Sequence, residues 1–287
     1  MLAVLTAASG AVPPFQLAAM TFAIGGLLGC ASWILRPSGL AALRQPVAVW
    51  ALGIGGLFGY HALYFTALRL APPAEAGLLN YLWPLLIVLL SATLPGEAGL
   101  RRGHVIGALL GLSGVVALFA GRGDLHFAAG ALPGYAASFA CAFVWAGYSV
   151  LSRRVGAVPT DAVAGFCLAT AVLSLLCHLA FERTVWPEGA TQWIALVALG
   201  LGPVGAAFYL WDIGMKRGDI RLLGVSSYAA PVLSTLILVA TGFAAATPAL
   251  GLACLLIVAG AVVAARAALT PAASGASPAG PPRNPRR

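Results

Sequence analysis

Several side chains that can hold a small molecule cluster inside one apolar run of the sequence, next to a proline. These side chains are Asn80, Tyr81 and Trp83, which lie within the four residues before Pro84. Proline removes a backbone donor and kinks a helix. Backbone groups freed at membrane depth are tolerated only where protein or a water-lined cavity satisfies them. We therefore predict that the amide, the phenol and the indole face an internal cavity.

A second set of polar residues stands before another proline, far along the chain. Ser226, Ser227 and Tyr228 precede Pro231, where we predict a second helix kink. Tyr228 is expected to face the same cavity as the first set. The two serines have two interpretations, because a serine in a membrane helix commonly bonds its own backbone instead of a ligand.

The remaining candidates lie on two other apolar runs. Tyr60 and Tyr64 are one turn apart and share a helix face, with His61 adjacent. Trp145 lies deep in a later run. Packing between helices is the alternative for each of these rings. If they line one cavity, its aromatic walls suit a flat ring, while Asn80, His61 and the serines meet the amino and carboxylate groups of a ligand.

Residues near the ends of the apolar runs have structural interpretations. Tryptophan concentrates at membrane–water boundaries, which predicts interfacial anchors at Trp33, Trp50, Trp186, Trp193 and Trp211. Glycines four residues apart, such as Gly103 and Gly107, predict close packing of helices.

The sequence lacks the groupings that enzymes and metal sites need. It has no HExxH, no GxSxG in a suitable context and no acidic pair, and its five cysteines show no CxxC or Cys/His spacing. We therefore predict no catalytic residue, no metal and no cofactor, and a protein that is not an enzyme.

Carboxylates are also missing from the centres of the apolar runs. The nearest, Asp212, is one turn from Lys216 and is expected to form a local ion pair. Since ion-driven and proton-driven transporters commonly keep a carboxylate in the membrane, facilitated diffusion or exchange is favoured. His61 is the one mid-membrane side chain that titrates near neutral pH and could couple transport to protons.

Composition places these candidates in a membrane protein. The 287 residues are 61% hydrophobic and 8% charged, against about 25% charged residues in soluble domains. A spanning helix needs about 20 residues, and nine apolar runs approach that length: Val12–Leu35, Pro46–Leu68, Ala74–Leu94, Gly103–Ala120, Gly130–Leu151, Thr160–Phe181, Thr191–Met215, Leu222–Gly242 and Pro248–Ala265. The segment Met1–Ala8 is too short to cross and is interpreted as half of a truncated first helix. The prediction is an all-α membrane protein with ten transmembrane helices.

The basic residues predict the orientation of the chain, because cytoplasmic loops are enriched in Lys and Arg. If the loop that holds Arg36 and Arg44 is cytoplasmic, thirteen of the sixteen basic residues lie on that side. Arg69, Arg122 and Arg183 are then outside, and the C-terminus is cytoplasmic. The last stretch, 269–287, is rich in Pro, Gly, Ala and Ser and is predicted to be disordered.

The chain also contains an internal repeat. The segment Gly59–Pro84 aligns without gaps on Ala206–Pro231, so that the two prolines and the two tyrosines before them coincide. Arg69 is paired with Lys216, yet the charge rule puts them on opposite sides of the membrane. A repeat of five helices inserts its second copy upside down, and inverted repeats with broken helices are a transporter architecture.

The end of the first repeat resembles a known family. Its sequence ALRLAPPAEAGLLNYLWPLLIVLLSATLPGEAGLRRGHVIGALLGLSGVVAL is similar to the drug/metabolite transporter superfamily, in the ten-helix branch with two EamA-type repeats. The resemblance covers nearly everything from Met1 to Arg266. It implies two inverted five-helix EamA-type repeats at 1–121 and 130–268, followed by a cytoplasmic tail at 269–287.

Within this branch, the NYLWP segment and the aromatic-rich third helix most resemble the YddG-type aromatic amino acid exporters. The resemblance implies a transporter of the bacterial inner membrane that exports aromatic and other apolar amino acids by alternating access. The implied partners are this small-molecule substrate and the lipid bilayer, with no nucleic acid, and we expect a monomer. The alternative is a permease or efflux protein of the same fold for another small metabolite or an amphipathic toxic compound.

Overall fold

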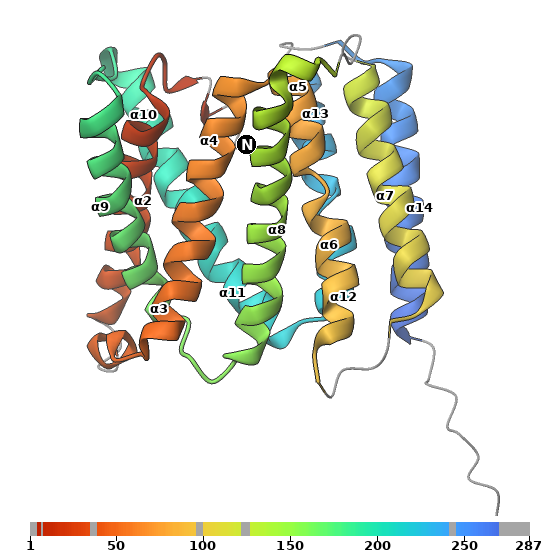
Figure 1. Cartoon of the computed structure of the whole chain (residues 1–287), viewed down its shortest axis with the longest axis horizontal. Coiled ribbons are helices and arrows are strands. Elements are labelled where there is room, and N and C mark those ends of the chain that lie inside the picture. The colour runs from red at the N-terminus through yellow and green to blue at the C-terminus, as the bar shows by residue number, and fades with distance from the viewer. Residues whose placement is uncertain are drawn as a thin grey trace, which may run out of the picture.

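The computed structural model describes residues 5–6, 8–34, 39–95, 100–121, 127–240 and 245–269, and the regular elements in these ranges are helices that stand side by side (Figure 1). The longer helices are α2 (Pro14–Trp33), α3 (Val47–Ile54), α4 (Tyr60–Leu70), α5 (Pro73–Asn80), α6 (Trp83–Leu90), α7 (Arg102–Ala120), α8 (Leu132–Arg154), α9 (Ala162–Phe181), α10 (Gly189–Leu201), α11 (Ala207–Arg217), α12 (Ile220–Ser226), α13 (Ala229–Ala240) and α14 (Pro248–Leu269). The predicted disordered tail, apart from Leu269, and most of the segment Met1–Ala8 lie outside the described residues.

Nine segments of the described chain are long and apolar enough to cross a membrane, and each overlaps one of the nine predicted runs. Four of them consist of two consecutive helices: α3 with α4, α5 with α6, α10 with α11, and α12 with α13. The chain is therefore an all-helical, multi-pass membrane protein, as its composition predicted.

The two predicted proline kinks are present. Helix α5 ends at Asn80, four residues before Pro84, and α12 ends at Ser226, five residues before Pro231. This spacing has a steric cause, because a proline ring clashes with the carbonyl group four residues earlier. The side chains that precede each proline therefore lie at a break between two helices, where backbone groups are available.

A rare helix type supports the internal alignment. One five-residue π-helical turn joins α3 to α4 at Gly55–Gly59, and another joins α10 to α11 at Gly202–Ala206. When the alignment is extended four residues upstream at the same offset, these two segments become equivalent residue by residue. Single π-helical turns are uncommon and often mark functional sites, so their coincidence is independent evidence that the two halves share one design. In Figure 1, α3 and α4 run upward whereas α10 and α11 run downward.

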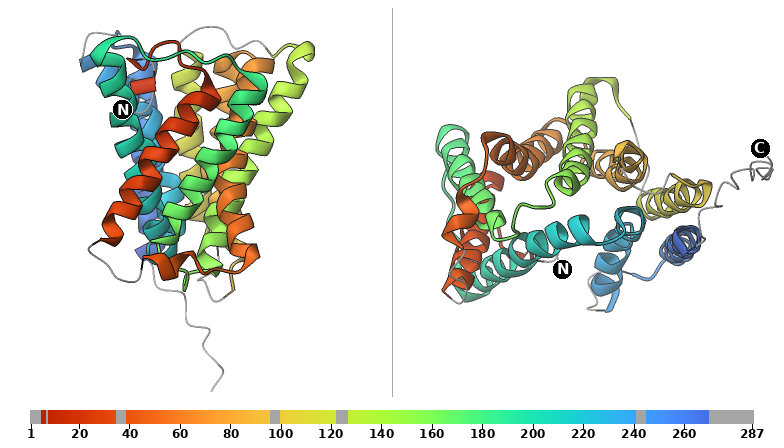
Figure 2. Two further views of the ribbon diagram at one scale, coloured as in Figure 1. Left: turned by 90° about the vertical axis from the view of Figure 1, so that its left-hand side faces the viewer. Right: turned by 90° about the horizontal axis from the view of Figure 1, so that it is seen from below.

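Small residues set the closest helix contacts. Helices α7 and α14 stand beside each other at one end of the molecule (Figures 1 and 2). A Cβ atom added at Gly107 would lie 2.6 Å from the carbonyl oxygen of Gly260. The backbones can therefore approach only because both positions lack a side chain, which agrees with the predicted packing role of the spaced glycines.

Candidate functional site

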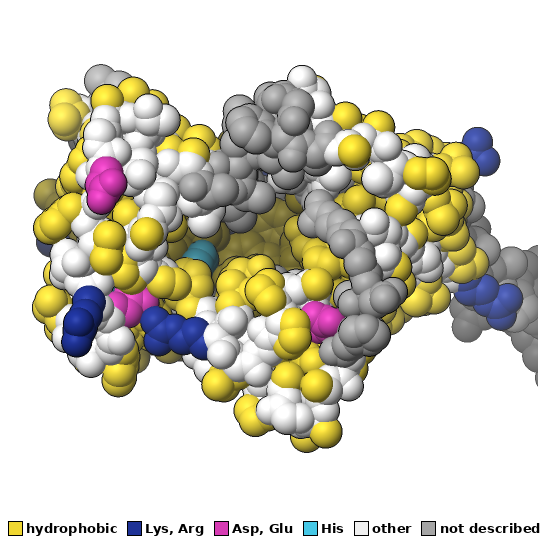
Figure 3. All heavy atoms as spheres, turned by 90° about the horizontal axis from the view of Figure 1, so that it is seen from above, with side chains coloured by type: hydrophobic (Ala, Val, Ile, Leu, Met, Phe, Trp, Pro, Cys, Tyr) yellow, Lys and Arg dark blue, Asp and Glu magenta, His cyan; other side chains and the backbone are white. Residues whose placement is uncertain are grey.

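A cavity of about 610 Å³ opens between the two halves. Its walls include residues from α2, from one face of α4, from the break after α5, from the end of α10 and from the π-helical turn that follows α10: Leu17, Phe22, Tyr60, His61, Tyr64, Phe65, Leu68, Tyr81, Leu199 and Val204. It opens toward the face where α4 and α9 end, which we call the upper face. Seen from this face, the molecule has a central hollow whose visible walls are mainly hydrophobic (Figure 3). The volume lies within the range of small-molecule sites, roughly 300–1,000 Å³.

Aromatic rings form one wall of the cavity, as predicted for this face of α4. The rings of Tyr60 and Tyr64 are stacked, with centroids 6.1 Å apart. His61 packs edge-on against Phe22 at 4.8 Å. Asn80, buried behind the wall, donates from Nδ2 to the phenolic oxygen of Tyr60 over 2.9 Å. The amide thus fixes the position of a wall tyrosine.

The hydrogen bond of His61 fixes its tautomer. Nδ1 lies 2.7 Å from the carbonyl oxygen of Leu57, which belongs to the π-helical turn. A carbonyl oxygen only accepts, so Nδ1 carries the hydrogen. In the neutral ring Nε2 is then an acceptor. His61 therefore brings a hydrogen-bond acceptor to a wall that is otherwise mostly apolar.

Three tryptophans pack together behind Tyr60, whose ring lies 5.2 Å from that of Trp145, and none of them is among the residues that line the cavity. Trp83 and Trp145 lie 6.3 Å apart, and both contact Trp211, at 5.6 and 5.7 Å between ring centroids. The indole Nε1 of Trp211 donates to the hydroxyl oxygen of Ser149 over 3.0 Å. The sequence analysis was wrong about Trp211, which it treated as an interfacial anchor. Its ring packs inside the helix bundle against Trp83 and Trp145, although it lies only six residues before the end of the span Gly189–Arg217.

The second kink contributes less to the cavity than predicted. Ser227 donates its hydroxyl to the carbonyl of Leu223 over 2.7 Å, and Ser226 is exposed at the end of α12. Tyr228 is fully buried, and its phenolic oxygen accepts from the backbone N–H of Leu85 at 3.1 Å. Ser226, Ser227 and Tyr228 are therefore all absent from the cavity wall. Ser227 and Tyr228 bond to backbone groups instead, and Ser226 is exposed.

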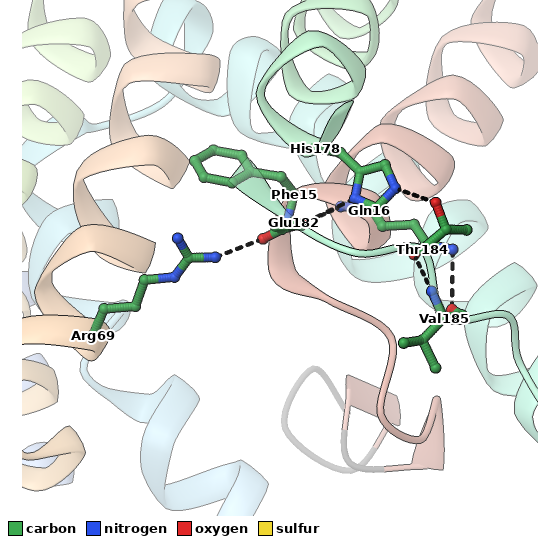
Figure 4. Close-up of polar contacts among 7 residues, drawn as sticks. All are labelled: Phe15, Gln16, Arg69, His178, Glu182, Thr184 and Val185. Atoms are coloured by element: carbon green, nitrogen blue, oxygen red, sulfur yellow. Dashed lines mark hydrogen bonds and ion pairs between the residues drawn. The ribbon is translucent and has the colours of Figure 1, made fainter. Parts of the chain in front are cut away.

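A buried carboxylate that the sequence analysis did not single out lies at the upper face (Figure 4). Glu182, only 3% exposed, accepts from the backbone N–H groups of Phe15 and Gln16 at 3.1 Å. It also pairs with Arg69 at 2.9 Å and with His178 at 3.1 Å. It thereby caps the N-terminus of α2, whose first N–H groups have no partner within the helix, and joins α2, α4 and α9. The sequence held one signal that could have led to Glu182. The alignment pairs Arg69 with Lys216, for which an acidic partner was predicted, so Arg69 could be expected to have one as well.

The lower face, where α8 and α11 end, is closed by a different set of interactions. Lys216 pairs with Asp212 at 2.8 Å, so the predicted local ion pair is confirmed. Lys216 also donates to the carbonyl of Val158 over 2.9 Å, and the hydroxyl of Thr160 donates to Asp212 over 2.7 Å. Two residues of the linker between α8 and α9 are therefore tied to α11. Among the described residues, no group of His, Cys, Asp and Glu could hold a metal ion.

A multi-pass helical protein with a central cavity that is open on one side has the architecture of a transporter. The sequence agrees, since the profile of the EamA-like transporter family matches residues 2–120 and 132–266. The chain belongs to this family. This confirms the resemblance to the EamA branch of the drug/metabolite transporters and the prediction of a transporter rather than an enzyme.

Relatives with curated names lie at several distances. The aromatic amino acid exporter YddG of Ancylobacter novellus is 65% identical over 264 residues, which cover 92% of this chain and 91% of that protein. The protein of the same name in Escherichia coli is 25% identical, with 82% and 81% covered. A biotin transporter of Salmonella typhimurium is 29% identical over 186 residues, which cover 64% of this chain and 60% of that one. A solved crystal structure with 64% identity has a TM-score of 0.88 and covers 93% of both chains.

Proposed function

We propose that the protein exports aromatic and other apolar amino acids across the bacterial inner membrane by alternating access through the central cavity. The observation that carries this proposal is the wall of aromatic rings in a cavity sized for a small molecule. The name of the relative with 65% identity supports the same substrate class. A flat substrate ring stacks against Tyr60 and Tyr64, and Trp145 supports Tyr60 from behind the cavity wall. The acceptor nitrogen of His61 and the phenol of Tyr81 meet its polar groups.

The architecture proposed for this cycle is that of ten helices in two inverted five-helix repeats, 1–121 and 130–268. In this arrangement the upper face is external, and the lower face and the tail 269–287 are cytoplasmic. The basic side chains support it: Arg69 bonds at the upper face, whereas Arg153 and Lys216 bond at the lower one. We expect one chain to be sufficient for transport.

The proposed energy source is the substrate gradient or an exchanged substrate. None of the described residues in the cavity wall is an Asp or a Glu, and a carboxylate in the membrane is the usual carrier of a coupled ion or proton. Net flux then follows the amino acid gradient, and the fold works in both directions.

The test is uptake of labelled tryptophan, phenylalanine and threonine into proteoliposomes. We expect saturable flux, with tryptophan and phenylalanine favoured. Unlabelled biotin should compete weakly, because it has neither an aromatic ring nor an ammonium group. Tyr64→Ala removes a wall ring and should raise the half-saturation concentration for tryptophan about tenfold, the effect of losing roughly 1.4 kcal/mol. The matched control is Phe139→Ala, an exposed ring outside the cavity wall.

Two results would reject the proposal. If none of the three amino acids shows saturable flux, the substrate class is wrong. If biotin competes as well as tryptophan does, the alternative of a permease for another small metabolite is favoured.

A further inference from the structure

The internal alignment assigns a counterpart to each residue of the cavity wall on α4. Four of the five wall residues on α4 are compared, His61, Tyr64, Phe65 and Leu68, which we call the α4 face; the fifth, Tyr60, has the exposed Ala207 as its counterpart. Their counterparts on α11 are Phe208, Trp211, Asp212 and Met215, which we call the α11 face. The equivalent π-helical turns directly before both helices show that the register is correct at this point.

The two faces are in opposite states. The α4 face borders open space, whereas the α11 face is packed. Met215 is fully buried, Asp212 is 3% exposed and Phe208 is 8% exposed. Trp211 is sandwiched against Trp83 and Trp145. In inverted-repeat transporters alternating access is largely a rocking of one repeat against the other, so the face that is packed here is the one that opens when the repeats rock toward the other side.

The two faces meet near the middle of the molecule. The rings of His61 and Phe208, which are equivalent residues, lie 6.2 Å apart. Residues related by a pseudo-twofold axis can touch only close to that axis. The upper cavity and the closed lower region therefore lie on opposite sides of this contact, and together they form one path through the protein.

One position on the α11 face differs in chemistry from its counterpart. Phe65 is apolar, but Asp212 carries a carboxylate, and Lys216 lies one turn further along. We call Asp212 and Lys216 the inner pair. Its charges are satisfied by each other, by Thr160 and by the carbonyl of Val158. Opening the lower side must separate α11 from this linker, which removes a partner from each charge. The ion pair itself stays on α11, but each member then has an unsatisfied hydrogen-bonding site, which is unfavourable, so a ligand that supplies a donor to Asp212 and an acceptor to Lys216 favours the open form.

We propose that the α11 face lines the inward-open form of the substrate site and that the inner pair there binds the amino acid zwitterion. Asp212 accepts from the substrate ammonium group, and Lys216 donates to its carboxylate. The inference rests on the proposed export function, in which the substrate arrives from the cytoplasm. It makes the inner side of the path the one that recognises charge and the outer side the one that recognises rings.

Accessibility tests the first half of the proposal without requiring transport. Met215→Cys and Ile213→Cys are made in a background in which the five native cysteines are replaced, and an impermeant maleimide is applied from the cytoplasmic side. Ile213 lies on the exposed side of α11 and is the matched control. We expect Met215→Cys to react several-fold faster when tryptophan is present on the cytoplasmic side, with no change at Ile213→Cys. A Met215→Cys that never reacts while the protein transports would overturn the proposal.

Substrate affinity measured separately on the two sides tests the second half. Asp212→Asn should raise the half-saturation concentration for tryptophan supplied from the cytoplasmic side by about tenfold, the value of one lost charge-assisted contact. Tryptophan binding from the external side should stay unchanged, which also shows that the variant is folded. Arg217→Gln removes an exposed neighbouring charge and should change neither value.

The outcomes separate the two proposals. Equal effects of Asp212→Asn on both sides, or an effect on neither, would overturn the role of the inner pair while leaving export intact. If the wild-type protein transports no amino acid but Met215→Cys still reacts from the cytoplasmic side, export fails and the inward-open wall stands.

Discussion

The segment from α3 to α4 and the segment from α10 to α11 share a backbone design but differ in what they contact. Both contain a π-helical turn at the same register, and both have a basic residue one position before their last residue, Arg69 or Lys216. The acid that pairs with Arg69 is Glu182, which follows a different helix, α9, whereas the acid that pairs with Lys216 is Asp212 on α11 itself. The first segment therefore depends on a neighbouring helix at its end, and the second is tied within itself and to a linker.

This difference shows how a nearly symmetric backbone can hold an asymmetric state. The upper ends of α2, α4 and α9 are joined at Glu182 without closing the cavity, because the carboxylate binds backbone N–H groups at the start of α2. At the lower face, the linker between α8 and α9 is joined to α11. The bonds are those of Val158 with Lys216 and of Thr160 with Asp212. The residues that face the centre of the molecule therefore border a ligand-sized cavity in the upper half and are packed against other side chains in the lower half.

The largest effect on stability is expected at Glu182. Glu182→Gln replaces an acceptor of two backbone N–H groups and one guanidinium with a neutral amide, which should cost about 3 kcal/mol. The midpoint of thermal unfolding in detergent should fall by roughly 6 °C or more. Glu188→Gln changes an exposed acid seven residues from the end of α9 and is the control. An equal midpoint for both variants would show that the junction of α2, α4 and α9 does not depend on this carboxylate.

Substitution of the two tyrosines at the helix breaks, Tyr81 and Tyr228, should affect different properties of the protein. Tyr228→Phe leaves the backbone N–H of Leu85 without its acceptor and should cost about 1–3 kcal/mol of unfolding free energy. Tyr81→Phe changes a residue in the cavity wall and should alter the half-saturation concentration for tryptophan. Thermal unfolding and flux measured on both variants decide the matter. The same pattern for both tyrosines would remove the distinction between the two kinks.

The sequence could predict those parts of the site that local rules determine. Helical spacing brings Tyr60 and Tyr64 to one face, and proline chemistry breaks the helix after Asn80. It could not predict the partner of Tyr228, because the N–H that this phenol satisfies belongs to the other repeat and is found only by tertiary packing. Ser227 bonds its own backbone, which was the alternative left open, whereas Ser226 is exposed, and neither serine lines the cavity.

Depth in the membrane was the least predictable property. Trp211 lies near the end of an apolar run, but a span of 29 residues with a π-helical turn places its ring against Trp145. Glu182 follows the last residue of α9 and looks like part of a loop in the sequence, but it folds over the start of α2 and becomes buried. In both cases the position along one span did not determine the surroundings, because neighbouring helices start and end at different heights.

The smallest effect is expected at His61, where the comparison of the two segments can be tested through protons. Its counterpart Phe208 cannot titrate, so a proton carried by His61 would have no acceptor at the equivalent position of the α11 face. Glutamine can keep a donor for the carbonyl of Leu57. His61→Gln should therefore change substrate-gradient flux by no more than about twofold, since it alters one neutral hydrogen bond. An imposed pH gradient without a substrate gradient should drive no tryptophan into proteoliposomes of either protein. Accumulation by the wild type that is lost in His61→Gln would make His61 a proton carrier, and accumulation by both would require a carrier elsewhere in the chain.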